Sequence, residues 1–120
     1  MNNKELAMKA ATLLLKKKAL DVVIIDISIK SSFADYFVIA SGNSERQIGT
    51  LSDEIIEQLA KEGVFAKSIE GKKSSGWILL DYGDVIINIF SIEQRERYNI
   101  EKLWGDCAVI SIEDEKPLNL

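Results

Sequence analysis

The stretch from residue 76 to residue 90, GWILLDYGDVIINIF, constrains the fold of this 120-residue chain more than any other segment. It contains two apolar runs, residues 77–82 and 85–90, and β-branched and aromatic residues of this kind are typical of strands. Asp81 and Asp84 stand on either side of Gly83 between the runs. Because Asp and Gly are the residues that a tight turn requires, the stretch predicts two neighbouring strands joined by a hairpin.

The two aspartates have a second interpretation, as ligands of a metal ion. A carboxylate pair that holds one cation is most simply built from positions i and i+2 of one strand, whose side chains share a face. Asp81 and Asp84 are three positions apart with Gly83 between them, and Asp21 and Asp26 are five apart. We therefore interpret these acids as turn and strand-end residues, and we predict no metal site.

The chain has no histidine and one cysteine, Cys107. The lack of histidine excludes a Ser-His-Asp or Cys-His nucleophile and any histidine metal ligand. One cysteine gives neither an internal disulfide nor a zinc pattern, which fits a reducing, cytoplasmic location. The first 18 residues are too charged for a signal peptide, and no apolar stretch reaches the ~18 residues of a membrane span. We expect no catalytic residue, no cofactor and no membrane partner.

The remaining sequence alternates between helix and strand patterns. Helices are predicted from leucine and isoleucine spacing, from the capping-box patterns that begin at Ser44 and Ser91, and from a stop at Gly63. The predicted helices cover residues 4–18, 44–61 and 91–98, and the predicted strands cover residues 21–29, 35–42, 64–69, 77–82, 85–90 and 108–112. Residues 70–76 read as a loop and residues 113–120 as a frayed tail. The fold class is α/β (α+β): one domain, residues 1–120, with a mixed sheet of about five to six strands flanked by helices.

The net charge of −4 is unevenly distributed. Residues 1–30 carry six lysines against three acids, and residues 31–120 carry nine basic against sixteen acidic residues, so the parts hold +3 and −7. Nucleic-acid binding depends mainly on Lys and Arg at phosphates, so we expect no direct reading of nucleic acid. We interpret Lys16, Lys17 and Lys18 as a solvated helix end. An acidic body suits a basic partner better.

A nucleotide-binding function is the alternative. The loop Ser41-Gly42-Asn43-Ser44 joins a predicted strand to a helix, and in nucleotidyltransferases a Gly-Ser loop at such a helix N-terminus holds phosphates. Those enzymes also bind magnesium with an i, i+2 acidic pair. Here the only comparable spacing of acids is Glu113-Asp114-Glu115 in the tail, which is the wrong place. The loop is equally explained as a helix cap.

Alternation along the strand at residues 77–82 separates two sets of side chains. Trp77, Leu79 and Asp81 share one face of the strand, and Ile78, Leu80 and Tyr82 share the other. If the second set faces the core, an exposed Trp77 and Leu79 beside acids would form a binding patch, since large aromatics anchor interfaces. If helices cover both faces, Trp77 is a core residue. Periodicity does not decide between the two.

Three segments in this order and spacing resemble a known family. The segments ADYFVIASGNSERQ, EG followed by GWILLDYGDVIINIF, and ERYNIEKLWGD are similar to the successive signature blocks of the Iojap/ribosomal silencing factor (RsfS) family. The resemblance extends from about Asp21 to Asp106. One departure is Asn88, which occupies a strand position where the family usually has histidine.

The resemblance implies a fold like that of nucleotidyltransferases without their catalytic acids, and a protein that is not an enzyme. It implies binding to the large ribosomal subunit through ribosomal protein L-fourteen, on the face that meets the small subunit. Such binding obstructs subunit joining and lowers translation in starved or resting cells. The resemblance also implies a homodimer when the protein is free.

The resemblance further implies a partner-facing patch that contains Trp77, Leu79, Asp81 and Tyr82. Arg95, Tyr98 and Trp104 are additional candidates, which could equally pack the last helix onto the sheet. Glu70 and Asp84 are expected to offer carboxylates to Lys or Arg of the partner.

Overall fold

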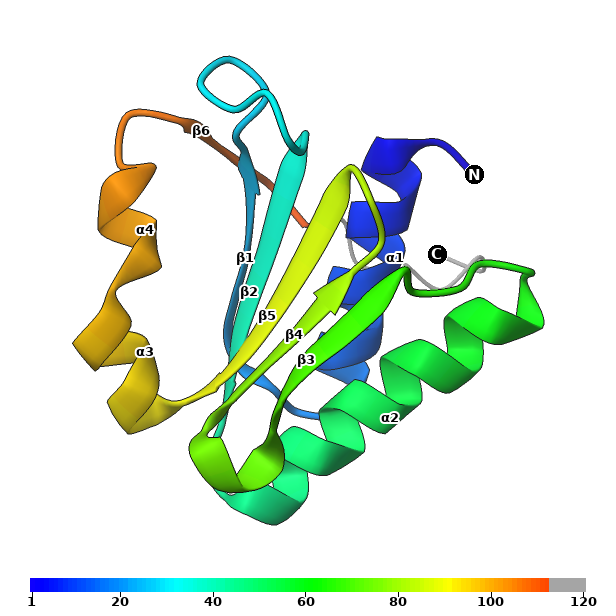
Figure 1. Ribbon diagram of the computed structural model, residues 1–120, viewed down its shortest axis with the longest axis vertical. Helices are drawn as coiled ribbons and strands as arrows, with labels where there is room; N and C mark the ends of the chain where they lie inside the picture. The colour runs from blue at the N-terminus through cyan, green and yellow to red at the C-terminus, as the bar shows by residue number, and fades with distance from the viewer. Residues whose placement is uncertain (113–120) are drawn as a thin grey trace, which may run out of the picture.

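A computed structural model of the protein describes residues 1–112; the predicted tail, residues 113–120, lies outside the described residues. Within residues 1–112, ten helices and strands and one short 3₁₀ turn follow one another (Figure 1). In order they are α1 (Asn3–Lys16), β1 (Leu20–Asp26), β2 (Tyr36–Gly42), α2 (Glu45–Lys61), β3 (Ser68–Lys72), the 3₁₀ turn η1 (Lys73–Ser75), β4 (Trp77–Asp81), β5 (Val85–Ser91), α3 (Ile92–Tyr98), α4 (Ile100–Leu103) and β6 (Ala108–Ile110).

The six strands form one mixed sheet in the order β3-β4-β5-β2-β1-β6, which confirms the predicted fold class. β2 and β5 run parallel, and every other neighbouring pair is antiparallel. β4 and β5 are the predicted hairpin. At its turn Gly83 has a φ of 89°, and its N–H donates to Asp81 Oδ1 at 2.7 Å. The interpretation of Asp81 as a turn residue is therefore confirmed.

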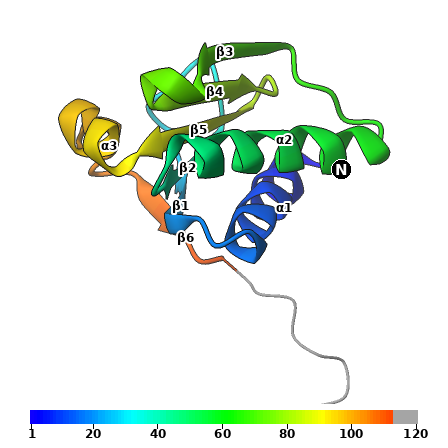
Figure 2. The ribbon, with the colours of Figure 1, turned by 90° about the horizontal axis from the view of Figure 1, so that it is seen from below.

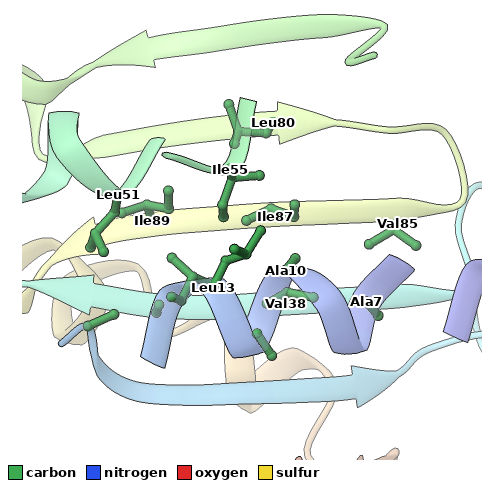
Figure 3. Close-up of a cluster of buried hydrophobic side chains, with 14 of the residues drawn as sticks. Ala7, Ala10, Leu13, Val38, Leu51, Ile55, Leu80, Val85, Ile87 and Ile89 are labelled. Atoms are coloured by element: carbon green, nitrogen blue, oxygen red, sulfur yellow. The ribbon is translucent and has the colours of Figure 1, made fainter. Parts of the chain in front are cut away.

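Helices α1 and α2 lie on one side of the sheet, and α3 lies on the other (Figure 2). Ala7 and Ala10 bring α1 close to the strands, and Leu51 and Ile55 of α2 pack beside them (Figure 3). The strands contribute the alternate residues Val38, Leu80, Ile87 and Ile89, each completely or almost completely buried. This cluster is the main core, and it follows from apolar side chains at helical spacing that meet one face of a pleated sheet.

The ends of α2 agree with the sequence-based prediction. Ser44 Oγ accepts the N–H of Gln47 at 3.0 Å, and Gln47 Oε1 accepts the N–H of Asn43 at 2.7 Å. Thus Gln47 returns one residue further than a standard capping box, but it still satisfies a free donor. Gly63 follows the last turn with a φ of 76°, which is the left-handed conformation expected there.

The predicted strand at residues 64–69 is wrong in position. Val64 donates its N–H to Leu59 O at 2.9 Å, and Val64 and Ala66 pack against the core as the chain leaves α2. Pairing with β4 begins only at Ser68, opposite Asp81, and continues to Lys72, opposite Trp77. The predicted loop at residues 70–76 is therefore half strand and half 3₁₀ turn.

Two other predicted strands are too long. β1 ends at Asp26 instead of residue 29. Asp26 Oδ1 accepts both the backbone N–H of Ser28 at 3.0 Å and the Ser28 hydroxyl at 2.6 Å, and these two hydrogen bonds turn the chain out of the strand. β6 ends at Ile110 instead of residue 112. It pairs with β1 over three residues.

Candidate binding face

The side of the sheet away from α1 and α2 carries most of the residues singled out from the sequence, and we call it the Trp77 face. Its members follow from the register, because residues directly opposite one another in neighbouring strands project from the same face. Leu79 is opposite Glu70 in β3 and Asn88 in β5. Trp77 is opposite Lys72 and Phe90, and Asp81 is opposite Ser68 and Ile86. Further rows continue through Phe37 and Ile39 of β2 to Ile25 and Val23 of β1.

The segment formed by α3 and α4 covers only part of the Trp77 face. The ring of Tyr98 lies 4.8 Å from that of Trp77, and the ring of Trp104 lies 5.6 Å from that of Phe37, centroid to centroid. Beneath them Phe90 is completely buried. Trp77 and Leu79 are half-buried at the margin of this cover. The two alternatives left by periodicity are thus both partly correct: Trp77 packs against α3, and its surroundings reach solvent.

Asn88 fixes the orientation of Trp77. Asn88 is 1% exposed, and its side-chain Oδ1 accepts the indole N–H of Trp77 at 3.0 Å. The Trp77 ring also stacks on Phe90 at 4.9 Å, with 29° between the ring planes. Asn88 was not predicted as a site residue. The signal that would have found it is its place as the one polar residue in the apolar run VIINIF, on the face shared with Leu79.

A hollow of about 230 Å³ opens beside Trp77. It is lined by Glu70, Gly71, Ser75, Trp77, Leu79 and Tyr98. Four residues predicted from the sequence, Glu70, Trp77, Leu79 and Tyr98, are brought together there. Gly71 and Ser75 were not predicted. Gly71 has a φ of 86°, and a Cβ added to it would lie 2.0 Å from the carbonyl oxygen of Trp77, so only glycine fits this approach of β3 to β4.

The other five predicted residues do not line the hollow. Asp81 is half-buried on the same face, and its carboxylate holds the Gly83 N–H. Asp84 is exposed beyond the hairpin turn, where its Oδ2 accepts from Asn3 Nδ2 at 3.2 Å. Trp104 packs edge-on against Phe37 near β1 and β2. The structure does not gather these residues into one patch with Trp77.

Tyr82 is separated from Trp77 by the sheet. Tyr82 is 9% exposed and belongs to the main core with α1 and α2. Burial raises the pKa of the Tyr82 hydroxyl above the ordinary value of 10.0. The expectation that Tyr82 belongs to the same patch as Trp77 is therefore corrected. The alternation along the strand that places Trp77 on the Trp77 face places Tyr82 on the opposite face, with Ile78 and Leu80.

Arg95 has a structural role within the chain. Its guanidinium forms two hydrogen bonds with the Glu101 carboxylate, at 2.8 and 3.2 Å, and a third with Ser41 Oγ at 3.1 Å. Only 11% of its side chain is exposed. Arg95 thus ties α3 to α4 and both to β2, and so holds Tyr98 over Trp77.

The loop considered for nucleotide binding lines a different hollow, of about 370 Å³, at the N-terminus of α2. Asn43, Ser44 and Lys73 are among its lining residues, and the Ser44 hydroxyl already caps α2. Within residues 1–112, no three His, Cys, Asp or Glu side chains are grouped as a metal ion would require. None of the helices in this part of the chain is long and apolar enough to cross a membrane.

These features describe a small α+β protein with one sheet face closed by helices and the other partly open. Over residues 1–119 the chain matches the family described as "Ribosomal silencing factor during starvation". The chain belongs to the ribosomal silencing factor (RsfS) family, a family of translational regulators, as the resemblance implied. It is 37% identical over 113 residues to the ribosomal silencing factors of Halalkalibacterium halodurans and Bacillus subtilis, covering 94% of this chain and 97% and 96% of theirs.

Solved structures agree with this assignment. The crystal structure of a protein from Chromobacterium violaceum matches with a TM-score of 0.84 and 31% identity, covering 98% of this chain and 91% of that one. A more distant relative, 32% identical over 97 residues, is the mouse protein named "Mitochondrial assembly of ribosomal large subunit protein 1", of which the match covers 42%.

Proposed function

We propose that this protein binds the large ribosomal subunit through ribosomal protein L-fourteen, and that it sterically blocks association with the small subunit. Translation is thereby repressed during starvation or in stationary phase. The action is that of an obstacle and involves no covalent chemistry. The single observation that supports this most is the family match over residues 1–119, which links the chain to silencing during starvation.

The partly open Trp77 face supports a docking function. Leu79 and Trp77 present half-buried apolar surface beside Glu70 and Asp81, in an arrangement where aromatic and aliphatic anchors are bordered by charge. Interfaces between proteins often have such an apolar centre with a polar rim. The negative charge of residues 31–120 favours encounter with a basic ribosomal protein and opposes contact with rRNA phosphates. We therefore assign partner binding to Trp77, Leu79, Asp81, Glu70 and Tyr98, with Asp84 as an outlying carboxylate.

The assignment includes where the protein acts and in what form. It acts in the cytoplasm, where ribosomal subunits are present, and it needs no cofactor. We also propose a homodimer for the free protein, as the family resemblance implies. Sedimentation equilibrium of the purified chain measures that state directly, and a monomer across the micromolar range would refute the dimer alone.

Cosedimentation with purified ribosomal subunits tests the central proposal. The wild-type chain is expected to pellet with large subunits, to remain behind with small subunits, and to reduce the yield of joined ribosomes. Leu79→Glu places a charge in the centre of the Trp77 face and is expected to abolish pelleting. Ile69→Glu is the matched control, because Ile69 lies on the adjacent edge strand, is 54% exposed, and projects from the opposite face.

Two results would contradict the proposal. One is a wild-type chain that does not bind large subunits, and the other is a pair of variants, Leu79→Glu and Ile69→Glu, that bind equally well. The nucleotide-binding alternative is tested by thermal shift with nucleoside triphosphate and magnesium, because a ligand bound only by the native state raises its melting temperature. Stabilisation that disappears in a Lys73→Ala variant would favour that alternative over a purely docking protein.

A further inference from the structure

The 230 Å³ hollow beside Trp77 has walls of three chemical kinds. Trp77 and Tyr98 provide aromatic rings, Leu79 provides an aliphatic surface, and Glu70 provides the one charged side chain of the lining. The two rings lie only 4.8 Å apart and tilted by 45°, so they contact each other and form adjoining walls. A side chain that enters the hollow would meet both rings from one side.

Glu70 is the residue of the hollow whose side-chain carboxylate lacks a partner within residues 1–112. Its side chain is exposed on the edge strand β3, and it forms no ion pair or hydrogen bond within the described part of the chain. Lys72 projects from the same face, opposite Trp77, but it neither lines the hollow nor pairs with Glu70. The carboxylate is thus free to receive a cation from outside.

We propose that this hollow receives a lysine or arginine side chain of the protein partner, an inference that rests on the proposed docking function and specifies its chemistry. The aliphatic stem of the incoming residue would lie against Leu79, and its charged end would reach Glu70 beside the two rings. A cation near an aromatic face is attracted by the ring quadrupole, and the attraction increases when water is excluded. A lysine or arginine therefore uses all three kinds of wall at once.

Other occupants use the hollow less well. An apolar side chain would cover Glu70 without pairing it, and burying an unpaired carboxylate is costly. A phosphate or an acidic side chain would be repelled by the same group. The hollow is also held ready in advance, because Asn88 and Phe90 fix the Trp77 ring and Arg95 fixes the helix that carries Tyr98. A pre-formed site loses little freedom when a partner binds.

The first test measures the affinity of the full-length protein for purified large ribosomal subunits. Glu70→Gln keeps the shape of the side chain and removes its charge, and it is expected to weaken binding about ten-fold. Tyr98→Leu removes one ring and is expected to weaken binding about three-fold, whereas Tyr98→Phe, which keeps the ring, is expected to weaken binding less than Tyr98→Leu does. Glu57→Gln is the control, because Glu57 is an exposed acid on α2, on the far side of the sheet.

The outcomes separate this inference from the proposed function. If Leu79→Glu abolishes binding while Glu70→Gln and Glu57→Gln both bind as the wild type does, the basic occupant is refuted and the ribosomal role stands. If the wild-type chain binds no large subunits, the ribosomal role is refuted. The second test alone then decides whether the hollow binds a cationic side chain.

The second test uses small probes and needs no ribosome. N-acetyl-arginine amide, N-acetyl-lysine amide and the neutral N-acetyl-glutamine amide are added to the ¹⁵N-labelled protein, and the indole N–H signal of Trp77 is followed by NMR. A Trp77→Phe sample identifies that signal against Trp104. At least one cationic probe is expected to shift the Trp77 indole signal in the wild type and not in Glu70→Gln, and the neutral probe is expected to cause no shift. The cationic probe that causes the larger shift identifies whether lysine or arginine is the preferred occupant. No shift with either cation, or equal shifts in Glu70→Gln, would overturn the inference.

Discussion

Replacing Trp77 by alanine should both weaken partner binding and lower stability, and the second effect can be estimated from the contacts. Truncating a fully buried tryptophan costs about 3–5 kcal/mol, and the half-buried Trp77 should cost about half of that, roughly 2 kcal/mol. Asn88, which is only 1% exposed, would also lose the donor to its Oδ1, which adds about 1 kcal/mol. We expect a total near 3 kcal/mol. Trp77→Phe keeps a ring on Phe90 and loses only the hydrogen bond, at about 1 kcal/mol.

Urea unfolding followed by far-UV circular dichroism measures these differences, and an unchanged m-value would show that the variants unfold between the same states. Leu103→Ala is the control, because Leu103 is 71% exposed and its truncation should change stability by no more than about 0.5 kcal/mol. A cost below about 1 kcal/mol for Trp77→Ala would refute the described packing of the indole on Asn88 and Phe90. Because a domain of this size has only about 5–15 kcal/mol of stability, lost binding by Trp77→Ala is interpretable only beside this measurement.

Three further changes test other parts of the structure. Tyr82→Phe removes a buried hydroxyl that has no hydrogen-bond partner among residues 1–112 and should raise the free energy of unfolding by about 1 kcal/mol. Burial raises the pKa of Tyr82 in the folded state, so the unfolded chain loses this proton first and wild-type stability should fall as the pH rises past about 10. The urea midpoint of Tyr82→Phe should fall less steeply over the same pH range. Gly71 has a φ of 86°, and the Cβ that Gly71→Ala adds would lie 2.0 Å from Trp77 O, so this variant should lower the melting temperature by an amount equivalent to at least about 2 kcal/mol. Gly63→Ala, at a φ of 76° and with open space around the added Cβ, should cost only about 1 kcal/mol, and equal losses from the two variants would contradict the close approach of β3 to β4. Arg95→Met should accelerate amide hydrogen exchange across residues 92–104 and leave β2 and β5 protected, and uniform acceleration would show that Arg95 supports the whole fold.

Much of the fold was predictable because its main signals are local. The turn at Asp81 and Gly83, the caps at Ser44 and Ser91 and the stop at Gly63 depend on residues within a few positions of one another. The position of β3 was not predictable in the same way. All five residues of β3 are exposed at the sheet edge, so the sequence shows no alternation of apolar and polar residues there. Only the pairing with β4 defines this strand. The apolar residues before it, Val64 and Ala66, gave a strand-like pattern because they close the core beside α2.

The candidate face was predictable within one strand and not between strands. Alternation alone places Trp77, Leu79 and Asp81 together, and the register confirms that they share a face. The same alternation placed Tyr82 inward, so its inclusion in the patch followed from the resemblance and conflicted with the physical argument. The meeting of Glu70, Trp77 and Tyr98 depends on the register of β3 and on the path of α3. Neither the register of β3 nor the path of α3 can be predicted from the spacing of residues along the chain. The hydrogen bond from the Trp77 indole N–H to Asn88 Oδ1 likewise depends on the register of the β4–β5 hairpin.

The position of the open surface follows from how unequally the two sides of the sheet are covered. On one side α1 and α2, with 14 and 17 residues, are long enough to close the core over the strands. On the other side α3 and α4 have only seven and four residues, and Arg95 holds them toward β1 and β2 through Ser41 and Leu20. The central strands are therefore covered, and Phe90 and Asn88 are buried, whereas β3 and β4 extend beyond the cover. Trp77 and Leu79 are apolar surface that the chain's own helices only partly cover, and the proposed partner would complete the layer there, beside a Glu70 that has no ion pair within residues 1–112.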